Sequence, residues 1–517
     1  MLDVLRYRAQ DTPNRVALRD IDYACSYTYG QLLTRADHAA AFLVEQLGLA
    51  KGDRVAVVAG NSLYTVDLFF ASCQTGIIVD VVNPRLHAPE IAHMLEAEKP
   101  AAVFFGSQFA SKVKEVLAGI SACAACTLIC YDGCEGVELA GTDVENYQTN
   151  GSFKPIRPDW EDTQMLLHTG GTTGFPKAAM LSYRYFLMNA VAETTSWRLA
   201  ETDGVYAAMP LFHTSGWNVS MMPAFLAGAR VSLSRDFSPN IFLDLVEAGH
   251  LTVFMGADLL LSYVAQNPRF MGTDFARVRL LCCGASTVSQ KTLDAYWAHG
   301  LRLFMGYGMT EYGPNTCCPS VDQPLSENLK KPWMIGKPLI FTQMRVVRED
   351  GSTADTGEVG ELYLKGPLAF SGYWNNPEAT AEAFDGGWVK TGDMAFIDED
   401  GDITLCGRRK NMYISGGENV FPDETEHCMQ AHPGIADVCV IGVPDDKWGE
   451  VGKAIIVRNA DSNESRDEIA SWLESRLSTI KRPHYYAFTD ALPMNTAGKR
   501  DMAAIRKEFG SAADGRA

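Results

Sequence analysis

The sequence predicts an α/β protein with a large N-terminal domain of layered sheets and helices, including a β subdomain, and a small C-terminal α/β domain. Three observations support this prediction. Strand and helix patterns alternate from residue 27 to residue 305, short strands between Asp-Gly turns follow from 340 to 405, and a basic, glycine-rich stretch precedes a last α/β pattern. Alternating strands and helices are typical of parallel sheets covered by helices. The 517 residues also exceed what one hydrophobic core usually accommodates.

The first part of the chain begins with a predicted helix. Apolar residues recur at helical spacing from Leu32 to Leu47, and Gly48 stands where a helix C-cap is expected. The alternation then continues with a helix at 68–73 and with strands at 54–58, 77–79 and 101–105.

Four further strands are predicted at 205–209, 229–233, 253–255 and 278–283. In open α/β sheets, ligands gather at the carboxyl ends of such strands. Three breaks after strands are informative. The break at 209–214 carries a histidine, 283–286 is a tight turn where backbone can approach a planar ring, and 306–311 offers an aromatic face, a hydroxyl and a carboxylate.

The β subdomain is predicted from strands at 342–347, 358–365 and 402–406. The basic segment that follows places a domain boundary after residue 409, so that residues 1–409 form the N-terminal domain and 410–517 the C-terminal one. Strands are expected at 436–441 and 453–457. A helix capped by Ser465 and Glu468 is expected to bury five apolar residues, namely Ile469, Trp472, Leu473, Leu477 and Ile480.

Composition narrows the function classes. The formal net charge of −18 argues against a nucleic-acid partner, which would favour a basic face. No apolar run approaches the ~18 residues that a membrane span needs. The first ten residues carry charges and contain no apolar secretory core, so a cytoplasmic location is expected.

Four of the thirteen cysteines are spaced closely enough to suggest a metal site, namely Cys123, Cys126, Cys130 and Cys134. The segment from Thr127 to Tyr131 instead has the pattern of a buried strand, which would place Cys126 and Cys130 on one face as small apolar side chains. Reduced structural thiols are the preferred interpretation.

The segment from Leu167 to Lys177 has the composition of an anion-binding loop. Its glycines allow backbone N–H groups to approach phosphate oxygens, its threonines add hydroxyl donors, and its lysine adds positive charge. The G-x-x-x-x-G-K-[ST] spacing of a Walker A loop is absent. Taken alone, the segment is also compatible with a flexible surface loop.

Six motifs occur in order along the chain, and they are Thr169 to Lys177, Pro210 to His213, Tyr307 to Glu311, Thr391 to Asp393, Gly407 to Lys410 followed by Ser415 to Asn419, and Pro493 to Lys499. Together they resemble the acyl-adenylate-forming superfamily of acyl-CoA synthetases, peptide-synthetase adenylation domains and beetle luciferases. There are departures: His168-Thr169-Gly170-Gly171 replaces Tyr-Thr-Ser-Gly, and Ala178 and Met305 replace a glycine and a glutamine.

The resemblance implies an ATP-dependent acid–thiol ligase that uses ATP, Mg²⁺ and CoA. A carboxylate attacks the α-phosphorus of ATP to give acyl-AMP and diphosphate, and a thiol then displaces AMP. Lys499 would bridge the carboxylate and the α-phosphate, Thr310 would bind the α-phosphate, and Glu311 would hold Mg²⁺. The implied nucleotide contacts are Thr169, Gly170, Gly171, Thr172, Thr173, Gly174, Lys177, Gly284, Ala285, Ser286, Tyr307, Thr310, Asp393, Arg408 and Lys499.

The resemblance also implies a mobile C-terminal domain with its hinge at Lys410, which withdraws Lys499 after adenylation. CoA would then contact Ser415, Gly416, Gly417, Trp448 and Arg482. The implied acyl pocket includes His213, Trp217, Cys283 and Gly308, with Met222, Gly256, Met309 and Pro314 beside them. Core packing is an ordinary alternative for His213 and Trp448, as is a solvated surface position for Lys499.

The substrate is expected to be a hydrophobic carboxylic acid, fatty or aryl, because no charged side chain stands out among the pocket positions. An adenylating enzyme that loads a carrier protein is the alternative, although the chain has no carrier or condensation domain. A luciferase-like oxygenase is a third hypothesis. The expected partners are therefore small molecules, and a homodimer stays open.

Overall fold

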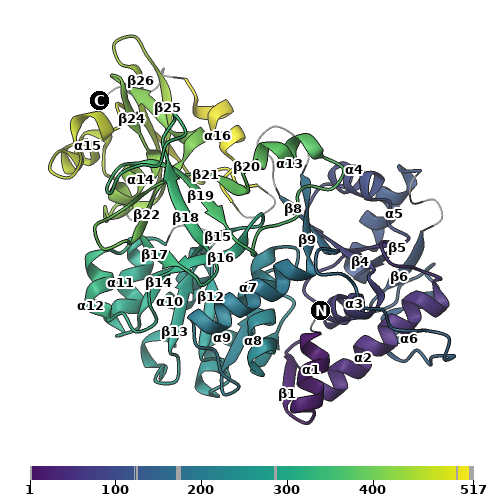
Figure 1. Cartoon of the computed structure of the whole chain (residues 1–517). Coiled ribbons are helices and arrows are strands. Elements are labelled where there is room, and N and C mark those ends of the chain that lie inside the picture. Colours follow the sequence, from purple (N-terminus) through teal and green to yellow (C-terminus); the bar gives the residue numbers. More distant parts are fainter. Residues whose placement is uncertain are drawn as a thin grey trace.

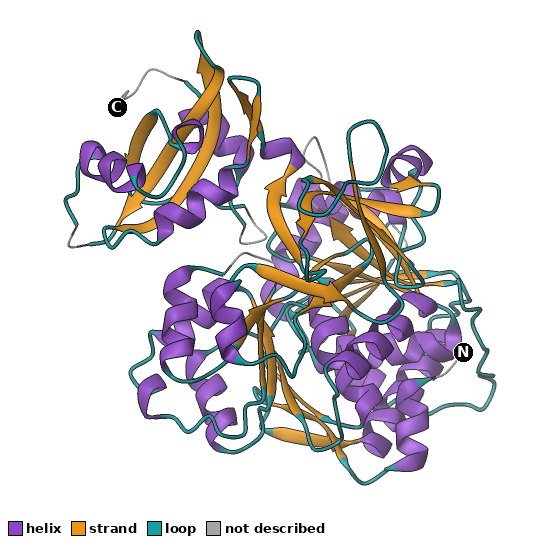
Figure 2. Ribbon diagram, turned by 60° about the vertical axis from the view of Figure 1, so that its left-hand side comes forward, coloured by secondary structure: helices purple, strands orange, loops and turns teal. Residues whose placement is uncertain are grey.

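Two mainly parallel sheets form the N-terminal part of the protein (Figure 1). The structure is a computed structural model that describes residues 3–121, 123, 126–169, 176–284, 288–460, 462–495 and 499–511. The α/β class predicted from the sequence is confirmed. Figure 2 shows the sheets with helices packed on their faces, and a smaller lobe at the C-terminal end.

The first sheet has the order β7-β6-β5-β3-β4-β8-β9 and is parallel except for its last pair. Its strands are β3 (Arg54–Val58), β4 (Ile78–Val82), β5 (Ala102–Phe105), β6 (Thr127–Cys130), β7 (Leu139–Ala140), β8 (Thr163–Thr169) and β9 (Lys177–Ser182). Its helices are α2 (Tyr29–Ala41), which continues as the π-helix η1 (Phe42–Gln46), α3 (Leu63–Thr75), α4 (Ala88–Glu98), η2 (Ser107–Phe109), α5 (Ala110–Ala118) and α6 (Gly141–Glu145). Buried apolar side chains cover both faces of this sheet.

The second sheet has the order β14-β13-β12-β10-β11-β1-β2. Its strands are β1 (Val16–Asp20), β2 (Cys25–Thr28), β10 (Gly204–Ala207), β11 (Arg230–Leu233), β12 (Val253–Gly256), β13 (Leu280–Cys283) and β14 (Leu303–Met305). Its helices are α1 (Val4–Asp11), α7 (Tyr183–Ser196), η3 (Gly216–Met221), α8 (Met222–Ala227), α9 (Pro239–Glu247), α10 (Asp258–Ala265), η4 (Phe270–Gly272) and α11 (Gln290–Ala298). The pairing of β1 with β11, more than 200 positions away, was not predicted.

The third sheet is the predicted β subdomain, and it runs β15-β16-β17-β22-β21-β19-β18 with β20 beside β21. Its strands are β15 (Tyr307–Met309), β16 (Gly313–Cys318), β17 (Met334–Pro338), β18 (Gln343–Val347), β19 (Gly360–Lys365), β20 (Phe384–Asp385), β21 (Trp388–Ile397) and β22 (Ile403–Arg408). Two helices, α12 (Leu325–Lys330) and α13 (Pro377–Ala383), accompany them. All its pairs are antiparallel.

The chain leaves the third sheet through the 3-10 turn η5 (Arg409–Asn411) and enters the fourth at β23 (Tyr413–Ser415). The other elements of this lobe are β24 (Glu418–Val420), α14 (Pro422–Gln430), β25 (Ile435–Asp445), β26 (Gly449–Arg458), α15 (Arg466–Glu474), η6 (Thr479–Lys481), β27 (Tyr485–Thr489) and α16 (Met502–Phe509). Separate apolar clusters form its core.

Helix α15 begins with the predicted capping box, in which Ser465 and Glu468 exchange side-chain and backbone hydrogen bonds. Its predicted buried face was too long. The helix ends at Glu474, so Leu477 and Ile480 lie beyond it and are only partly buried.

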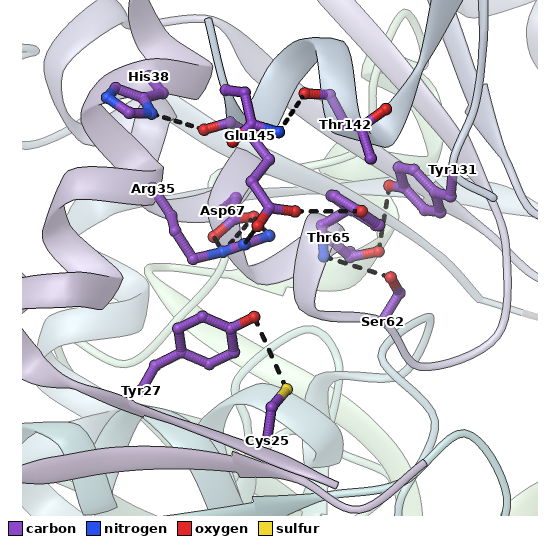
Figure 3. Close-up of polar contacts among 12 residues, drawn as sticks. Cys25, Tyr27, Arg35, His38, Ser62, Thr65, Asp67, Tyr131, Thr142 and Glu145 are labelled. Carbon is purple, nitrogen blue, oxygen red and sulfur yellow. Dashed lines mark hydrogen bonds and ion pairs between the residues drawn. The ribbon is translucent and has the colours of Figure 1, made fainter. Parts of the chain in front are cut away.

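A buried ion network joins α2, α3 and α6 (Figure 3). The Arg35 guanidinium contacts Asp67 Oδ2 at 2.7 Å and Glu145 Oε1 at 2.6 Å, while its side chain and that of Asp67 are 7% and 2% exposed. His38 Nδ1 lies 2.5 Å from the backbone oxygen of Glu145. The network therefore anchors the short helix α6 to the helices that cover the first sheet.

All thirteen cysteines are free thiols. Cys126 Sγ donates to Pro100 O at 2.7 Å, and Cys130 is buried in β6. Two sets of side chains in the described ranges are close enough to share a metal ion, Asp80/Glu98/His168 and Asp398/Asp400/Asp402, and neither contains a cysteine.

Candidate functional site

The anion-binding loop connects the two antiparallel strands β8 and β9, with Thr169 paired to Lys177. Gly170, Gly171, Thr172, Thr173 and Gly174 lie outside the described residues. At the end of the loop, Lys177 Nζ is 5.3 Å from the centroid of the Tyr373 ring. Strand pairing therefore fixes the two ends of the loop, and it holds Lys177 against an aromatic ring of the β subdomain.

Tyr373 also contacts the predicted metal ligand. Its hydroxyl donates to Glu311 Oε1 at 2.7 Å, and the Phe370 N–H donates to the Glu311 carbonyl at 2.9 Å. Burial, and next the charge of Glu311, raise the pKa of Tyr373. The motifs did not predict Tyr373, and the signal in the sequence that marks it is the aromatic run at 373–374 directly after a glycine.

Thr310 precedes Glu311, and its carbonyl accepts a 2.9 Å hydrogen bond from the Tyr185 hydroxyl. The same hydroxyl lies 2.9 Å from Thr214 Oγ1. Tyr185 therefore connects the 306–311 segment with the segment that carries His213.

The predicted ribose site centres on Asp393, a buried residue in β21. Tyr307 Oη donates to Asp393 Oδ2 at 2.5 Å, and Arg408 Nε lies 2.6 Å from Asp393 Oδ1. Burial raises the pKa of Asp393, against the opposing charge of Arg408. The structure thus brings Tyr307, Asp393 and Arg408 together, as the motifs indicated.

Lys499 approaches this group from the C-terminal lobe. The backbone N–H of Lys499 donates to Asn495 Oδ1 at 3.0 Å. Desolvation by the surrounding protein and then the charge of Arg408 lower the pKa of Lys499, whereas Asp393 and Glu311 raise it. A C-terminal lysine therefore lies within electrostatic reach of two acidic residues from the N-terminal domain.

His213 also lies within electrostatic reach of Lys499. Burial and then the positive charges of Lys499 and Arg85 lower its pKa to about 4, so the imidazole is neutral at pH 7. Its ring lies 4.7 Å from that of Phe212. A neutral histidine offers a donor and an acceptor without adding positive charge beside Lys499.

The other predicted acyl-pocket residues are tightly packed. Trp217 is fully buried, stacks on Phe69 at 4.5 Å, and donates its indole N–H to Leu211 O at 2.7 Å. Cys283 is buried in β13, and a side chain at Gly308 would collide with the backbone of Gly313. The family resemblance places these residues in the acyl pocket, whereas the structure gives Trp217 the contacts of a core residue.

Of the predicted adenine-binding turn at 284–286, the structure describes Gly284, whose N–H donates to Gly256 O at 3.0 Å. Ala285 and Ser286 lie outside the described residues. A side chain at Gly284 would collide with the Met255 methyl group. The Met255 side chain would therefore have to move to accommodate any larger residue at position 284.

Four of the five predicted CoA residues gather around β23. Gly416 has φ +59° and donates to Trp448 O at 2.8 Å, and a Cβ there would lie 2.8 Å from the Trp448 ring. Ser415 pairs with Gly449 beside Trp448, and Gly417 has open space at its Cβ position. Arg482 instead donates to Leu477 O at 3.0 Å and to Thr479 Oγ1 at 3.1 Å.

The predicted hinge residue, Lys410, is exposed at the centre of η5, between the third and fourth sheets. Arg506 Nη2 donates to its carbonyl at 3.5 Å. A stacked pair, Trp333 and His427, joins the two domains with ring centroids 5.0 Å apart.

Comparisons with known proteins identify the family. The family model described as "AMP-binding enzyme" matches residues 5–374, and "AMP-binding enzyme C-terminal domain" matches 424–499. The chain belongs to the AMP-binding enzyme family. It is an AMP-forming acid–thiol ligase of the acyl-adenylate-forming superfamily, which confirms the family resemblance.

Similar proteins span the whole chain. A feruloyl-CoA synthase from Amycolatopsis sp is 34% identical over 97% of this chain and 98% of its own. The long-chain-fatty-acid–CoA ligase FadD13 of Mycobacterium tuberculosis is 30% identical over 98% of both chains. The ATP-bound structure of MatB from Rhodopseudomonas palustris superposes with a TM-score of 0.88 at 28% identity, covering 99% of both chains.

Glu311 belongs to neither of the two described groups that could share a metal ion. One carboxylate suits Mg²⁺ when substrate phosphates supply further oxygen ligands. The donor set at Glu311 therefore fits a magnesium ion that arrives with the nucleotide. No helix in the described part of the chain combines the length and apolar character needed to cross a membrane.

Proposed function

We propose that this enzyme is an acyl-CoA synthetase that joins a hydrophobic carboxylic acid, fatty or aryl, to CoA. ATP would be converted into AMP and diphosphate through an acyl-adenylate. The observation that supports this most directly is that Lys499 of one domain lies within electrostatic reach of Glu311 and Asp393 of the other. The similarity to a feruloyl-CoA synthase and a fatty-acid–CoA ligase supports the class of acid.

The arrangement suits adenylation because a carboxylate and a triphosphate repel each other. Lys499 would neutralise part of this charge where the two meet, and Lys177 and Thr169 would hold the phosphates at the ends of the loop. Glu311 would hold Mg²⁺, whose charge stabilises phosphate oxygens when it is bound.

Asp393 would accept hydrogen bonds from the ribose hydroxyls. Tyr307 and Arg408 already hold its two oxygens in place, and each carboxylate oxygen keeps further acceptor capacity. His213, neutral at pH 7, would border the acyl group and the approach of the thiol.

Diphosphate release from ATP and Mg²⁺, measured over a panel of aryl, long-chain, short-chain and amino acids, tests the proposed substrate class. We expect the aryl or long-chain acids to give the highest kcat/KM. The highest value for an amino acid would contradict the substrate class while leaving the reaction type intact.

Adding CoA or a carrier protein to the preferred acid then identifies the acceptor. We expect acyl-CoA to form with CoA alone, and turnover only with a carrier protein would support the alternative acceptor. We also propose a cytoplasmic location, because thirteen free thiols are typical of a reducing compartment.

A further inference from the structure

Three titratable side chains from separate elements meet beside the start of the anion-binding loop. Asp80 lies in β4, Glu98 is the last residue of α4, and His168 lies in β8 immediately before Thr169. His168 Nε2 is 2.8 Å from Glu98 Oε1 and 3.7 Å from Asp80 Oδ1. The side chains of Asp80, Glu98 and His168 are 0%, 3% and 5% exposed.

The charges of this cluster are poorly compensated. Among the residues that the structure describes, no lysine, arginine or backbone N–H group donates to either oxygen of Asp80 or to Oε2 of Glu98, and the two carboxyl groups lie against each other. The nearby Arg54 guanidinium donates instead to the backbone carbonyls of Glu98 and Lys99. Buried carboxylates are normally paired or bound to a metal ion, because an isolated buried charge is costly.

A second acidic cluster shows how this protein pairs such charges elsewhere. Asp398, Asp400 and Asp402 surround Lys331 Nζ at 2.6, 2.7 and 3.1 Å. That cluster contains its own cation and is more exposed. Within the described ranges, Asp80 has no comparable lysine or arginine contact.

We propose that Asp80, Glu98 and His168 bind a divalent first-row transition-metal ion, for which Zn²⁺ is the best fit. Imidazole and carboxylate groups are common zinc ligands, at about 2.0–2.2 Å from the metal. One dication and two carboxylates with a neutral imidazole give a site of zero net charge, which removes the cost of burying two anions. The three ligand atoms already lie within 4.8 Å of one another.

The ion would connect three elements that are otherwise joined by strand pairing and apolar packing. The ion would fix the end of β8 to β4 and α4. Because His168 is adjacent to Thr169, the ion would also fix the first residue of the anion-binding loop. Its role is structural. Binding to the native state alone would raise the temperature of unfolding.

Metal content tests the proposal. The full-length wild type and the Asp80→Asn variant are stripped with a chelator, dialysed against Zn²⁺ without nucleotide, and measured by plasma mass spectrometry. Both proteins keep thirteen cysteines and Glu311, so zinc bound there cancels in the comparison. We expect the wild type to retain one more zinc equivalent than the variant. Equal zinc content would overturn the proposal.

Asp400→Asn is the matched control, because it alters an acidic cluster already occupied by a lysine. This variant should retain the wild-type zinc content, and a loss equal to that of Asp80→Asn would overturn the assignment to Asp80. The control separates a specific site from general attraction of zinc to acidic surface.

Two measurements keep the test decisive if Asp80→Asn folds poorly. Zn²⁺ should raise the unfolding temperature of the stripped wild type by several degrees. Co²⁺ should give visible d–d absorption that His168→Gln loses. Absence of both effects in the wild type would overturn the proposal in favour of a proton shared between the two carboxyl groups. Neither readout depends on ligase activity, so each is independent of the proposed function.

Discussion

At the scale of single residues, two roles can be tested at Glu311: binding a metal ion, and bracing its loop through hydrogen bonds. Its Oε1 accepts from Tyr373, and its carbonyl accepts from Phe370. The carboxylate group therefore combines a fixed position with a negative charge, and the two properties can be removed one at a time.

Glu311→Gln keeps the shape of the side chain but removes its charge. We expect adenylation to fall at least about 100-fold and the Mg²⁺ requirement to rise, because charge stabilisation by a metal is worth several kcal/mol. Diphosphate release measured against Mg²⁺ concentration checks this. Tyr373→Phe, which removes only the hydrogen bond, is the control and should keep the wild-type Mg²⁺ dependence. An unchanged Mg²⁺ curve in Glu311→Gln would remove this residue from the metal site.

Lys499→Ala should abolish acyl-adenylate formation but spare thioester formation from supplied acyl-AMP. Lys499 is expected to act only where the carboxylate meets the triphosphate, and acyl-AMP contains no triphosphate. Single-turnover assays of the two half-reactions measure the difference. Lys507→Ala, an exposed lysine of α16, serves as the control and should leave both half-reactions unchanged. Equal loss of both half-reactions in Lys499→Ala would refute the assigned role.

His213 should titrate near pH 4 in the native enzyme, as followed by NMR of its ring. Lys499→Ala should raise this pKa, because one of the positive charges that lower it is removed. Burial remains in the variant, so the pKa should stay below the ordinary value of about 6.5. An unshifted midpoint would show that Lys499 does not approach His213 in solution.

The same pKa affects stability. Below about pH 6.5 the unfolded chain binds a proton that native His213 does not, so acidification toward pH 4 destabilises the fold.

At the scale of elements, the network in Figure 3 holds α2, α3 and α6 together through one buried guanidinium. Asp67→Asn should lower the free energy of unfolding by about 3–5 kcal/mol, because it leaves Arg35 with only part of its buried counter-charge. Chemical denaturation measures this. Asp322→Asn is the control: Arg198 and Asp322 are 65% and 64% exposed, and their loss should cost at most about 1 kcal/mol. A similar effect of both variants would contradict the buried role.

At the scale of the whole molecule, two domains meet at a site to which each contributes charged groups. The proposed hinge, Lys410, is exposed in the short turn η5, and Trp333 stacks on His427 across the domain contact. The charges of Asp393 and Glu311 act on Lys499 in this structure, which fits the adenylation arrangement that the family resemblance implies. Thioester formation is expected to need a different arrangement. The family resemblance implies that Lys499 is then withdrawn and that CoA contacts the predicted residues around β23.

Lys410→Pro should leave adenylation within about twofold of wild type and slow thioester formation at least roughly tenfold. Proline fixes φ near −65°, which restricts rotation at the hinge. Lys410→Ala removes the same side chain while keeping backbone freedom, and it should preserve both half-reactions. If the proline variant forms thioester at the wild-type rate, residue 410 is not the hinge.

Local patterns predicted many elements closely. The strand expected at residues 54–58 is β3, and the capping box expected at Ser465 and Glu468 begins α15. Side-chain periodicity and capping residues act within a few positions, so they can be recognised without the fold. The pairing of β1 with β11 and the early end of α15 depended on distant packing, and the sequence did not predict them.

The sequence by itself determined the family and the sheet-and-helix architecture, and it named the candidate site residues, because these depend on local motifs. Only the tertiary structure decided which distant residues meet. It brought Lys499 within electrostatic reach of Asp393 and Glu311, added Tyr373 beside Glu311, and gathered Asp80, Glu98 and His168. The physical reason is that strand order and burial, which no local pattern specifies, set the contacts between residues far apart in the chain.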